Sequence, residues 1–135
     1  MDRVVVDTDI VSFYFKEDSR FELYQADLDG KQLVISFMTL AELFYWQELR
    51  HWGERRRALM NDAIEAGFVI YPVHTELCKT WSRLRMQAHE SGRVLDSADA
   101  WIAATAVQLG LPLASHNQRD FEYLPHLELI SRDEE

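Results

Sequence analysis

The sequence predicts an α/β sandwich built on a parallel sheet of four to five strands. Short runs of β-branched and other apolar residues alternate with longer amphipathic segments along the chain, which is the order typical of strand–helix–strand units. The first run, Arg3–Val6, contains three consecutive valines, as expected of a strand that is buried on both faces. The expected strands are Arg3–Val6, Leu33–Ser36, Phe68–Val73, Leu113–Ala114 and Leu127–Ile130.

The segments between these strands have the apolar spacing and the terminal residues of helices. A helix-start signal at Thr8-Asp9 precedes an aromatic-rich helix, and Gly67 ends a long helix with a polar face. The polar residues from Ser131 to Glu135 are expected to fray. The expected helices are Ile10–Phe15, Ser19–Leu28, Thr39–Leu49, Glu54–Ala66, Thr75–Glu90 and one that runs from Asp96 to Gly110.

Composition indicates one domain over residues 1–135, because 47% of the 135 residues are hydrophobic and only three are proline. No apolar stretch is long enough to span a membrane. The single cysteine, Cys78, excludes an internal disulfide and favours a reducing compartment, so we expect a cytoplasmic protein. We expect Cys78 itself to pack within its amphipathic helix.

The formal net charge of −9 argues against a broad surface that coats nucleic acid. It leaves a nucleic-acid enzyme open, because acids that bind a metal are part of the negative count. Basic residues crowd two segments, and a solvated helix face is the common meaning of such runs. A local contact with phosphate is the alternative. The two sets are Arg50, His51, Arg55, Arg56 and Arg57, and Lys79, Arg83 and Arg85.

Asp99 heads an otherwise apolar helix face formed with Ile102, Ala103, Ala106 and Val107. A carboxylate that points toward the interior needs a partner, a metal ion or a raised pKa. The structural alternative is a helix start in which Asp96 is the N-cap and Asp99 is the acid of a capping box.

Two further acids occupy positions that would suit an apolar residue. Asp7 continues the first strand, and Glu42 lies on a helix face with Met38, Tyr45, Trp46 and Leu49. Three converging carboxylates repel one another, and a hard cation such as Mg²⁺ or Mn²⁺ resolves that repulsion. The acids could then hold the metal and orient a water for attack on a phosphodiester. Zinc is disfavoured, because the histidines lack an i, i+4 pair and no cysteines cluster.

Four segments resemble the motifs of PIN domains, and most closely those of the VapC-type toxins of prokaryotic toxin–antitoxin pairs. The resemblance spans the whole chain and implies a single PIN-like three-layer α/β/α domain. It also implies an endoribonuclease that depends on Mg²⁺ or Mn²⁺, forms a homodimer, is inhibited by a cognate antitoxin and cuts structured RNA such as tRNA. The segments are Val5–Asp9, Thr39–Leu43, Asp99–Ala106 and Leu113–Phe121.

Position by position, the resemblance makes Asp7, Glu42 and Asp99 the principal catalytic and metal-binding acids. At the fourth position, where the family often has an acid, this chain has Asn117, and Asp120 follows three residues later. Either one could complete the metal site, because an amide carbonyl also binds a hard cation. The chain also departs from the pattern in having Asp9 where asparagine is common and Ser115 where threonine is frequent.

Two alternatives remain at the level of sequence. The Asp7-Thr8-Asp9 segment is similar to that of haloacid-dehalogenase-like phosphotransferases, which would need a later lysine, and the second half of the chain offers only Lys79. The other alternative is a catalytically inert PIN-like interaction module. The aromatic triplets Phe13–Phe15 and Phe44–Trp46 cannot point inward completely, which favours a groove for a partner helix or strand, such as the antitoxin. Stacking of these rings on RNA bases is the second possibility.

Overall fold

The computed structural model describes residues 2–133 and has a sheet of five parallel strands in the order β3-β2-β1-β4-β5. This arrangement confirms the predicted fold class. The outer strands β3 and β5 are shorter than predicted. The strands are β1 (Arg3–Val6), β2 (Gln32–Ser36), β3 (Val69–Tyr71), β4 (Leu113–Ala114) and β5 (Leu129–Ile130).

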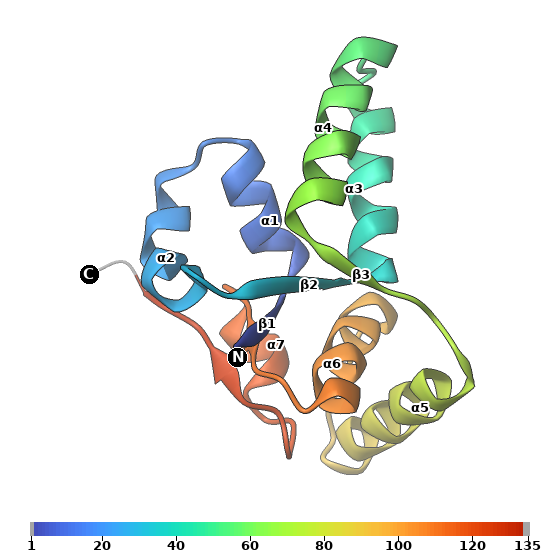
Figure 1. The fold of residues 1–135 in the computed structure, drawn as a ribbon. Coiled ribbons are helices and arrows are strands. Elements are labelled where there is room, and N and C mark those ends of the chain that lie inside the picture. Colours follow the sequence, from blue (N-terminus) through green and yellow to red (C-terminus); the bar gives the residue numbers. More distant parts are fainter. Residues whose placement is uncertain (1, 134–135) are drawn as a thin grey trace.

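Helices lie on both sides of the sheet and make three layers (Figure 1). Helices α5 and α6 pack together on one side, and α3 and α4 form a hairpin that extends away from the sheet. A 3-10 turn over Ser19–Phe21 leads into α2. The helices are α1 (Thr8–Phe15), α2 (Glu22–Leu28), α3 (Phe37–Leu49), α4 (Glu54–Gly67), α5 (Thr75–Glu90), α6 (Ser97–Leu109) and α7 (Gln118–Phe121).

Each layer of helices covers its own apolar core, because successive side chains of a strand point to opposite faces. Val5 and Val34 face α5, α6 and α7, and they belong to a core that includes Ile102. Val4 and Val6 face the other way, into a core shared with helices α1 to α4. The valine run therefore supplies both cores, as predicted for a strand that is buried on both faces.

The prediction of which face of α3 is buried is wrong. The row of α3 that is buried is Thr39, Leu43 and Gln47, whereas Tyr45 and Leu49, which we placed on the inner face, are 64% and 58% exposed. Gln47 can be buried because its amide donates hydrogen bonds to Asn61 Oδ1 and Met60 Sδ, which removes the cost of burying a polar group. Helix α3 also begins earlier than predicted, because the Ser36 hydroxyl caps it by accepting from Met38 N.

Three smaller features complete the fold. Cys78 is exposed, so the expectation that it packs is wrong. The chain does not fray at Ser131, because the Arg132 guanidinium is paired with Asp27 at 2.7 Å; Glu134 and Glu135 lie outside the described residues. Helix α7 had no counterpart in the prediction.

Within residues 2–133, no helix is both long and apolar enough to cross a membrane.

Candidate active site

The predicted acids gather beyond the carboxyl ends of β1 and β4, which are neighbours in the sheet. The strand order reverses here, because β2 lies on one side of β1 and β4 on the other. Such reversal points leave a crevice at the edge of an open parallel sheet, where ligands bind. The backbone N–H of Asp7 donates to the carbonyl of Ala114 at 2.9 Å, so the sheet itself fixes where the chain after β1 meets the chain after β4.

Asp7 is buried and held on both of its carboxylate oxygens. It is 3% exposed. Its Oδ1 accepts from the Thr8 N–H at 2.7 Å, as the N-cap of α1, and its Oδ2 accepts from the Ser115 hydroxyl at 2.7 Å. Burial, followed by the nearby charge of Asp9, raises the pKa of Asp7 well above its ordinary value, while the two hydrogen bonds act in the opposite direction.

Asp9 ties the loop after β4 to the start of α1. One carboxylate oxygen accepts from the His116 N–H at 2.9 Å, and the other accepts from the Ile10 N–H at 2.7 Å. Burial raises the pKa of Asp9, and its charge in turn contributes to the raised pKa values of Asp7 and Asp99. This acid, which departs from the family pattern, is therefore part of the same electrostatic cluster.

Asp99 stands in the first turn of α6 and is half-buried. Its pKa is raised to about 6, first by burial and then by the charges of Asp120, Asp96, Glu42 and Asp9. Asp96 is the N-cap of the helix, since it accepts from the Ala98 N–H at 3.2 Å, and this confirms half of the structural alternative. Within residues 2–133, no hydrogen bond joins the Asp99 side chain to the backbone of Asp96, so the arrangement is not a capping box.

Glu42 reaches the cluster from the second turn of α3. Its Oε1 accepts from the Thr8 hydroxyl at 2.6 Å, and that hydroxyl also lies 2.9 Å from the hydroxyl of Thr39. Glu42 is half-buried, and its charge contributes to the raised pKa of Asp99. The hydrogen bonds thus connect the helix that follows β1 with the helix that follows β2.

The two options for the fourth position differ in their surroundings. Both Asn117 and Asp120 are exposed. Asp120 lines a cavity of about 270 Å³ together with Asp99, and its charge is the largest electrostatic contribution to the raised pKa of Asp99. Asn117 lines a different cavity, and its N–H donates to the Ser115 hydroxyl at 3.1 Å. Asp120 therefore lies on the Asp99 side of the site.

The donor set suits a hard cation, because it consists of carboxylate oxygens. Burial raises the pKa values of Asp7, Asp9 and Asp99, and repulsion from neighbouring acids adds to the rise at Asp7 and Asp99. A bound cation would relieve both effects. Across residues 2–133, no three acid, histidine or cysteine side chains are close enough together to form a complete metal site. Hydrogen bonds hold the Asp7 and Glu42 oxygens on Ser115 and Thr8, so closure of the site around a cation would require Asp99 to move toward them.

Tyr24 is a residue near the site that sequence reasoning missed. Its hydroxyl lies 2.6 Å from His116 Nδ1 and accepts from the Arg132 N–H at 3.0 Å. Tyr24 is fully buried and comes from α2, so it joins the loop after β4 to the chain after β5. No local pattern marks it, because its partners are 92 and 108 residues away in sequence.

Known proteins resemble this chain over most of its length. A family model described as the PIN domain matches residues 4–127. The VapC ribonuclease Y4jK of Sinorhizobium fredii is 33% identical, with 88% of this chain and 90% of that protein covered. The tRNA(fMet)-specific endonuclease VapC of Shigella flexneri is 28% identical, with 89% and 90% covered.

Solved structures show the same fold. A chain of VapBC2 from Rickettsia felis, in a crystal structure with a promoter DNA fragment, superposes with a TM-score of 0.83 at 20% identity, covering 97% of this chain and 99% of that one. VapBC-5 from Mycobacterium tuberculosis gives a TM-score of 0.71 at 26% identity, covering 98% and 100%. The phosphotransferase alternative fails, since Lys79 is exposed on α5 and paired with Glu76. The chain belongs to the PIN domain family and, within it, to the VapC-type ribonuclease toxins.

Proposed function

We propose that this chain is an endoribonuclease that depends on Mg²⁺ or Mn²⁺, with Asp7, Glu42 and Asp99 as its catalytic and metal-binding residues. The observation that carries the proposal is the buried, doubly hydrogen-bonded Asp7 at the end of β1, close enough to Asp9 and Asp99 for their charges to raise its pKa. Such a cluster is costly to fold without a function for it. An inert interaction module gives no reason to retain it.

In this proposal each acid has its own task. Asp7 provides a fixed ligand, because Ser115 and the Thr8 N–H hold its carboxylate. Asp99, with a pKa of about 6, is mostly ionised at neutral pH and borders an open cavity, so its carboxylate can turn toward a ligand. Glu42 and either Asp120 or Asn117 complete the set. When bound, Mg²⁺ or Mn²⁺ supplies charge balance and polarises the attacking water and the phosphate.

The proposal predicts the chemistry of the RNA ends. Water lined up by Asp7 and Asp99 opposite the leaving 3′-oxygen leaves a 5′-phosphate and a 3′-hydroxyl, with no role for the 2′-hydroxyl. Ribonucleases that use the 2′-hydroxyl instead need a general acid and base, commonly histidines, and leave a cyclic phosphate. His116, which is the histidine at this site, binds Tyr24 through its Nδ1, and we expect it to be dispensable for bond cleavage.

The experiment is cleavage of a tRNA pool with Mg²⁺ or Mn²⁺, with and without EDTA, followed by mapping of the new ends. We expect EDTA to abolish cleavage and the products to carry 5′-phosphates. The Asp7→Asn variant, purified in the same way, controls for a contaminating nuclease. Full-rate cleavage in excess EDTA, or 2′,3′-cyclic phosphate ends, would overturn the metal mechanism. We propose tRNA as the substrate because the VapC of Shigella flexneri is a tRNA(fMet)-specific endonuclease.

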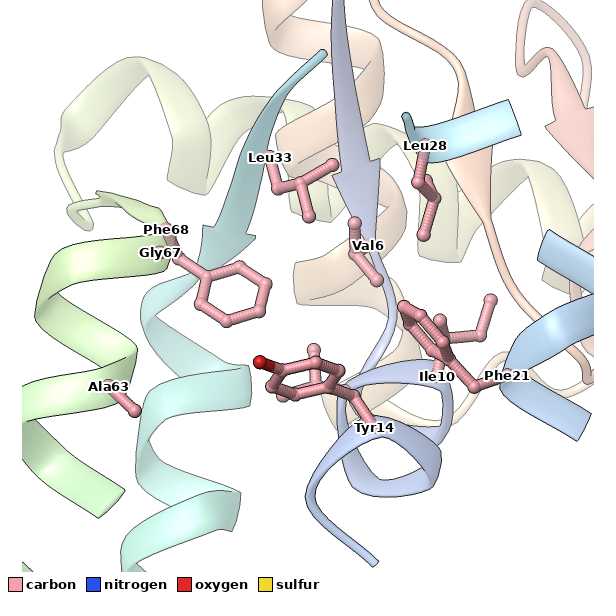
Figure 2. Close-up of a pocket in the computed structure, with 10 residues that line it drawn as sticks. Val6, Ile10, Tyr14, Phe21, Leu28, Leu33, Ala63, Gly67 and Phe68 are labelled. Atoms are coloured by element: carbon pink, nitrogen blue, oxygen red, sulfur yellow. The ribbon is translucent and has the colours of Figure 1, made fainter. Parts of the chain in front are cut away.

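We further propose that an antitoxin binds the apolar groove between α1 and α4. The groove is a cavity of about 200 Å³ lined by nonpolar side chains of α1, α2, α4 and the neighbouring strands. Figure 2 shows the rings of Tyr14, Phe21 and Phe68 around it. Tyr14 is 53% exposed, so part of an aromatic triplet faces outward as expected. An exposed apolar groove of this kind fits a helix or strand of a partner, and two of the similar structures are a toxin–antitoxin complex from Klebsiella pneumoniae and a member of the VapBC family of toxin–antitoxin systems.

The groove can be tested by co-expression of this chain with the reading frames that flank its gene, followed by co-purification. We expect Tyr14→Asp to lose the co-purified protein and to retain RNA cleavage. Tyr45→Asp is the matched control, because Tyr45 is 64% exposed on α3 and does not line the groove. If both variants retained the partner equally, the proposal that the antitoxin binds this groove would be wrong. We also propose a homodimer, which sedimentation of the purified chain measures directly.

A further inference from the structure

The cavity that contains Asp99 has a second cavity, over α5, as its neighbour. The first has a volume of about 270 Å³ and the second about 330 Å³, and Arg93, Val94 and Leu95 line both. The loop between α5 and α6 therefore borders both cavities, one at the acids and one along α5, and we call these two neighbouring cavities the groove. Val94, in the middle of this loop, is 91% exposed, so the loop itself is open to solvent.

Two arginines line this groove beside the acids. Arg93 and Arg119 share the first cavity with Asp99 and Asp120. Within residues 2–133, neither arginine lies within 4.0 Å of an acid in an ion pair. Both residues are exposed. In a chain of net charge −9, two guanidinium groups beside the catalytic acids, not neutralised by them, are available to an anionic ligand.

Aromatic rings accompany the arginines on both sides of the loop. The Arg93 guanidinium lies 4.5 Å from the centroid of the Tyr123 ring, and the Arg85 guanidinium lies 5.0 Å from that of Trp81. Arg85 is also fixed by donating to the Leu95 carbonyl at 3.1 Å. Cations that alternate with aromatic rings along a groove are the combination that binds single-stranded nucleic acid, through phosphates and bases respectively.

The basic tip of the α3–α4 hairpin is less suited to this role. There, Arg57 is paired with Glu48 at 2.9 Å, so its charge is neutralised within the hairpin, and it also donates to the Trp52 carbonyl at 2.6 Å. These contacts hold the turn together. The hairpin tip also lines none of the cavities that contain Asp99 or Asp120.

We propose that the groove along Arg93, Arg119 and Arg85 binds the single-stranded RNA that flanks the scissile phosphate. This inference rests on the proposed ribonuclease function and names the part of the chain that receives the substrate. Arg119 and Arg93 contact the phosphates next to the cut, and Arg85 and Trp81 contact the strand further along. The acids at one end of the groove repel phosphate unless a cation is bound, whereas the arginines hold the strand whether or not it is cut.

The test measures RNA binding apart from cleavage. Anisotropy of a fluorescein-labelled single-stranded RNA of about 12 nucleotides is followed in an Asp7→Asn background, with Mg²⁺ present. We expect Arg93→Gln and Arg119→Gln each to raise Kd about tenfold. The slope of log K against log salt should fall by about 0.7 for each lost phosphate contact. In proteins that retain Asp7, the same variants should raise KM and change kcat much less.

Two controls make the result specific. Arg55→Gln removes the same charge from the exposed face of α4 and should leave Kd unchanged. Arg93→Lys keeps the charge but loses the planar fork, so it should recover part of the affinity. Thermal unfolding of each variant verifies the fold.

Several outcomes would overturn the proposal that this groove binds RNA. These are an unchanged Kd for Arg93→Gln and Arg119→Gln, an equal loss for Arg55→Gln, and a change of oligomeric state in Arg93→Gln, which would make this loop a contact between copies of the chain. Failure of the proposed function looks different. If the parent cuts no RNA while binding depends on the groove arginines, the groove stands and the nuclease proposal falls.

Discussion

Asp7 and Asp99 lie close enough for the charge of one to raise the pKa of the other, yet their surroundings differ. Asp7 is fully buried, follows a central strand, and accepts hydrogen bonds from Ser115 and from the backbone of Thr8. Asp99 is half-buried at the start of a helix and borders an open cavity. One side of the site is held by the fold, and the other side is free to adjust. The difference indicates that Asp7 sets the position of the site and that Asp99 closes it around the ligand.

Substitution of Asp99 is expected to have the largest effect, and to change cleavage and stability in opposite directions. Asp99→Asn should lower cleavage about 100-fold or more, because a metal ligand is lost, with partial recovery at high Mn²⁺. It should also stabilise the protein at pH 7. A pKa of about 6 in the folded state exceeds that of the unfolded chain, so the stability that this carboxyl contributes is present at low pH and is lost as pH rises from about 4 to 6.

The gain from Asp99→Asn should be about 1 kcal/mol at pH 7, after allowance for solvent screening of a half-exposed group. At pH 4 the wild type and the variant should have the same stability. Urea unfolding at both pH values measures this difference. A variant that is less stable than the wild type at pH 7 and retains full cleavage would return Asp99 to the role of a helix-capping residue.

Substitution of Ser115 tests whether the hydrogen bonds that hold Asp7 matter for the site. Ser115→Ala removes a buried donor to Asp7 and the acceptor of the Asn117 N–H. We expect the free energy of unfolding to fall by about 1 to 3 kcal/mol and cleavage to fall about tenfold, as for other residues that orient metal ligands. Ser115→Thr keeps the hydroxyl and should restore most of the activity. Ser19→Ala, at an exposed position of the 3-10 turn, is the control.

The smallest effect is expected on the adjustable side, at the fourth position of the site. Asp120→Asn should raise the Mn²⁺ concentration for half-maximal cleavage about threefold, because a screened carboxylate near the ion contributes on the order of 1 kcal/mol. Asn117→Ala should change it less, since Asn117 does not share the cavity of Asp99. The reverse order of effects would make Asn117 the fourth ligand.

The parts of the fold that were predictable have causes within a short stretch of sequence. The valine run of β1, the N-cap at Asp96 and the spacing of α5 each depend on neighbours a few residues apart, whereas α1 begins at Thr8 with Asp7 as its N-cap, before the predicted start at Ile10. That acids would gather at one place could be predicted for the same reason, because Asp7 and Asp99 interrupt apolar patterns. Glu42 was predicted to join them, although through an incorrect face of α3, and its charge does reach Asp99.

The parts that were not predictable depend on partners that are distant in sequence. Gln47 is buried because Asn61 and Met60 satisfy its amide, and periodicity assigns such a row to the surface. Tyr24 and Ser115 reach their positions only when β1, β4 and the final strand are assembled. Whether Asp120 or Asn117 approaches Asp99 depends on α7, whose four residues are too few for periodicity to detect.

The contact between Tyr24 and the chain after β5 has a practical consequence for handling this protein. Because one phenol holds both the Arg132 backbone and the His116 ring, an alteration at the carboxyl-terminal end acts on the loop that carries Ser115. Truncation of the chain before Arg132 would remove the backbone N–H that donates to the buried Tyr24 hydroxyl. A tag joined through a flexible linker beyond Glu135 leaves the anchoring residues in place.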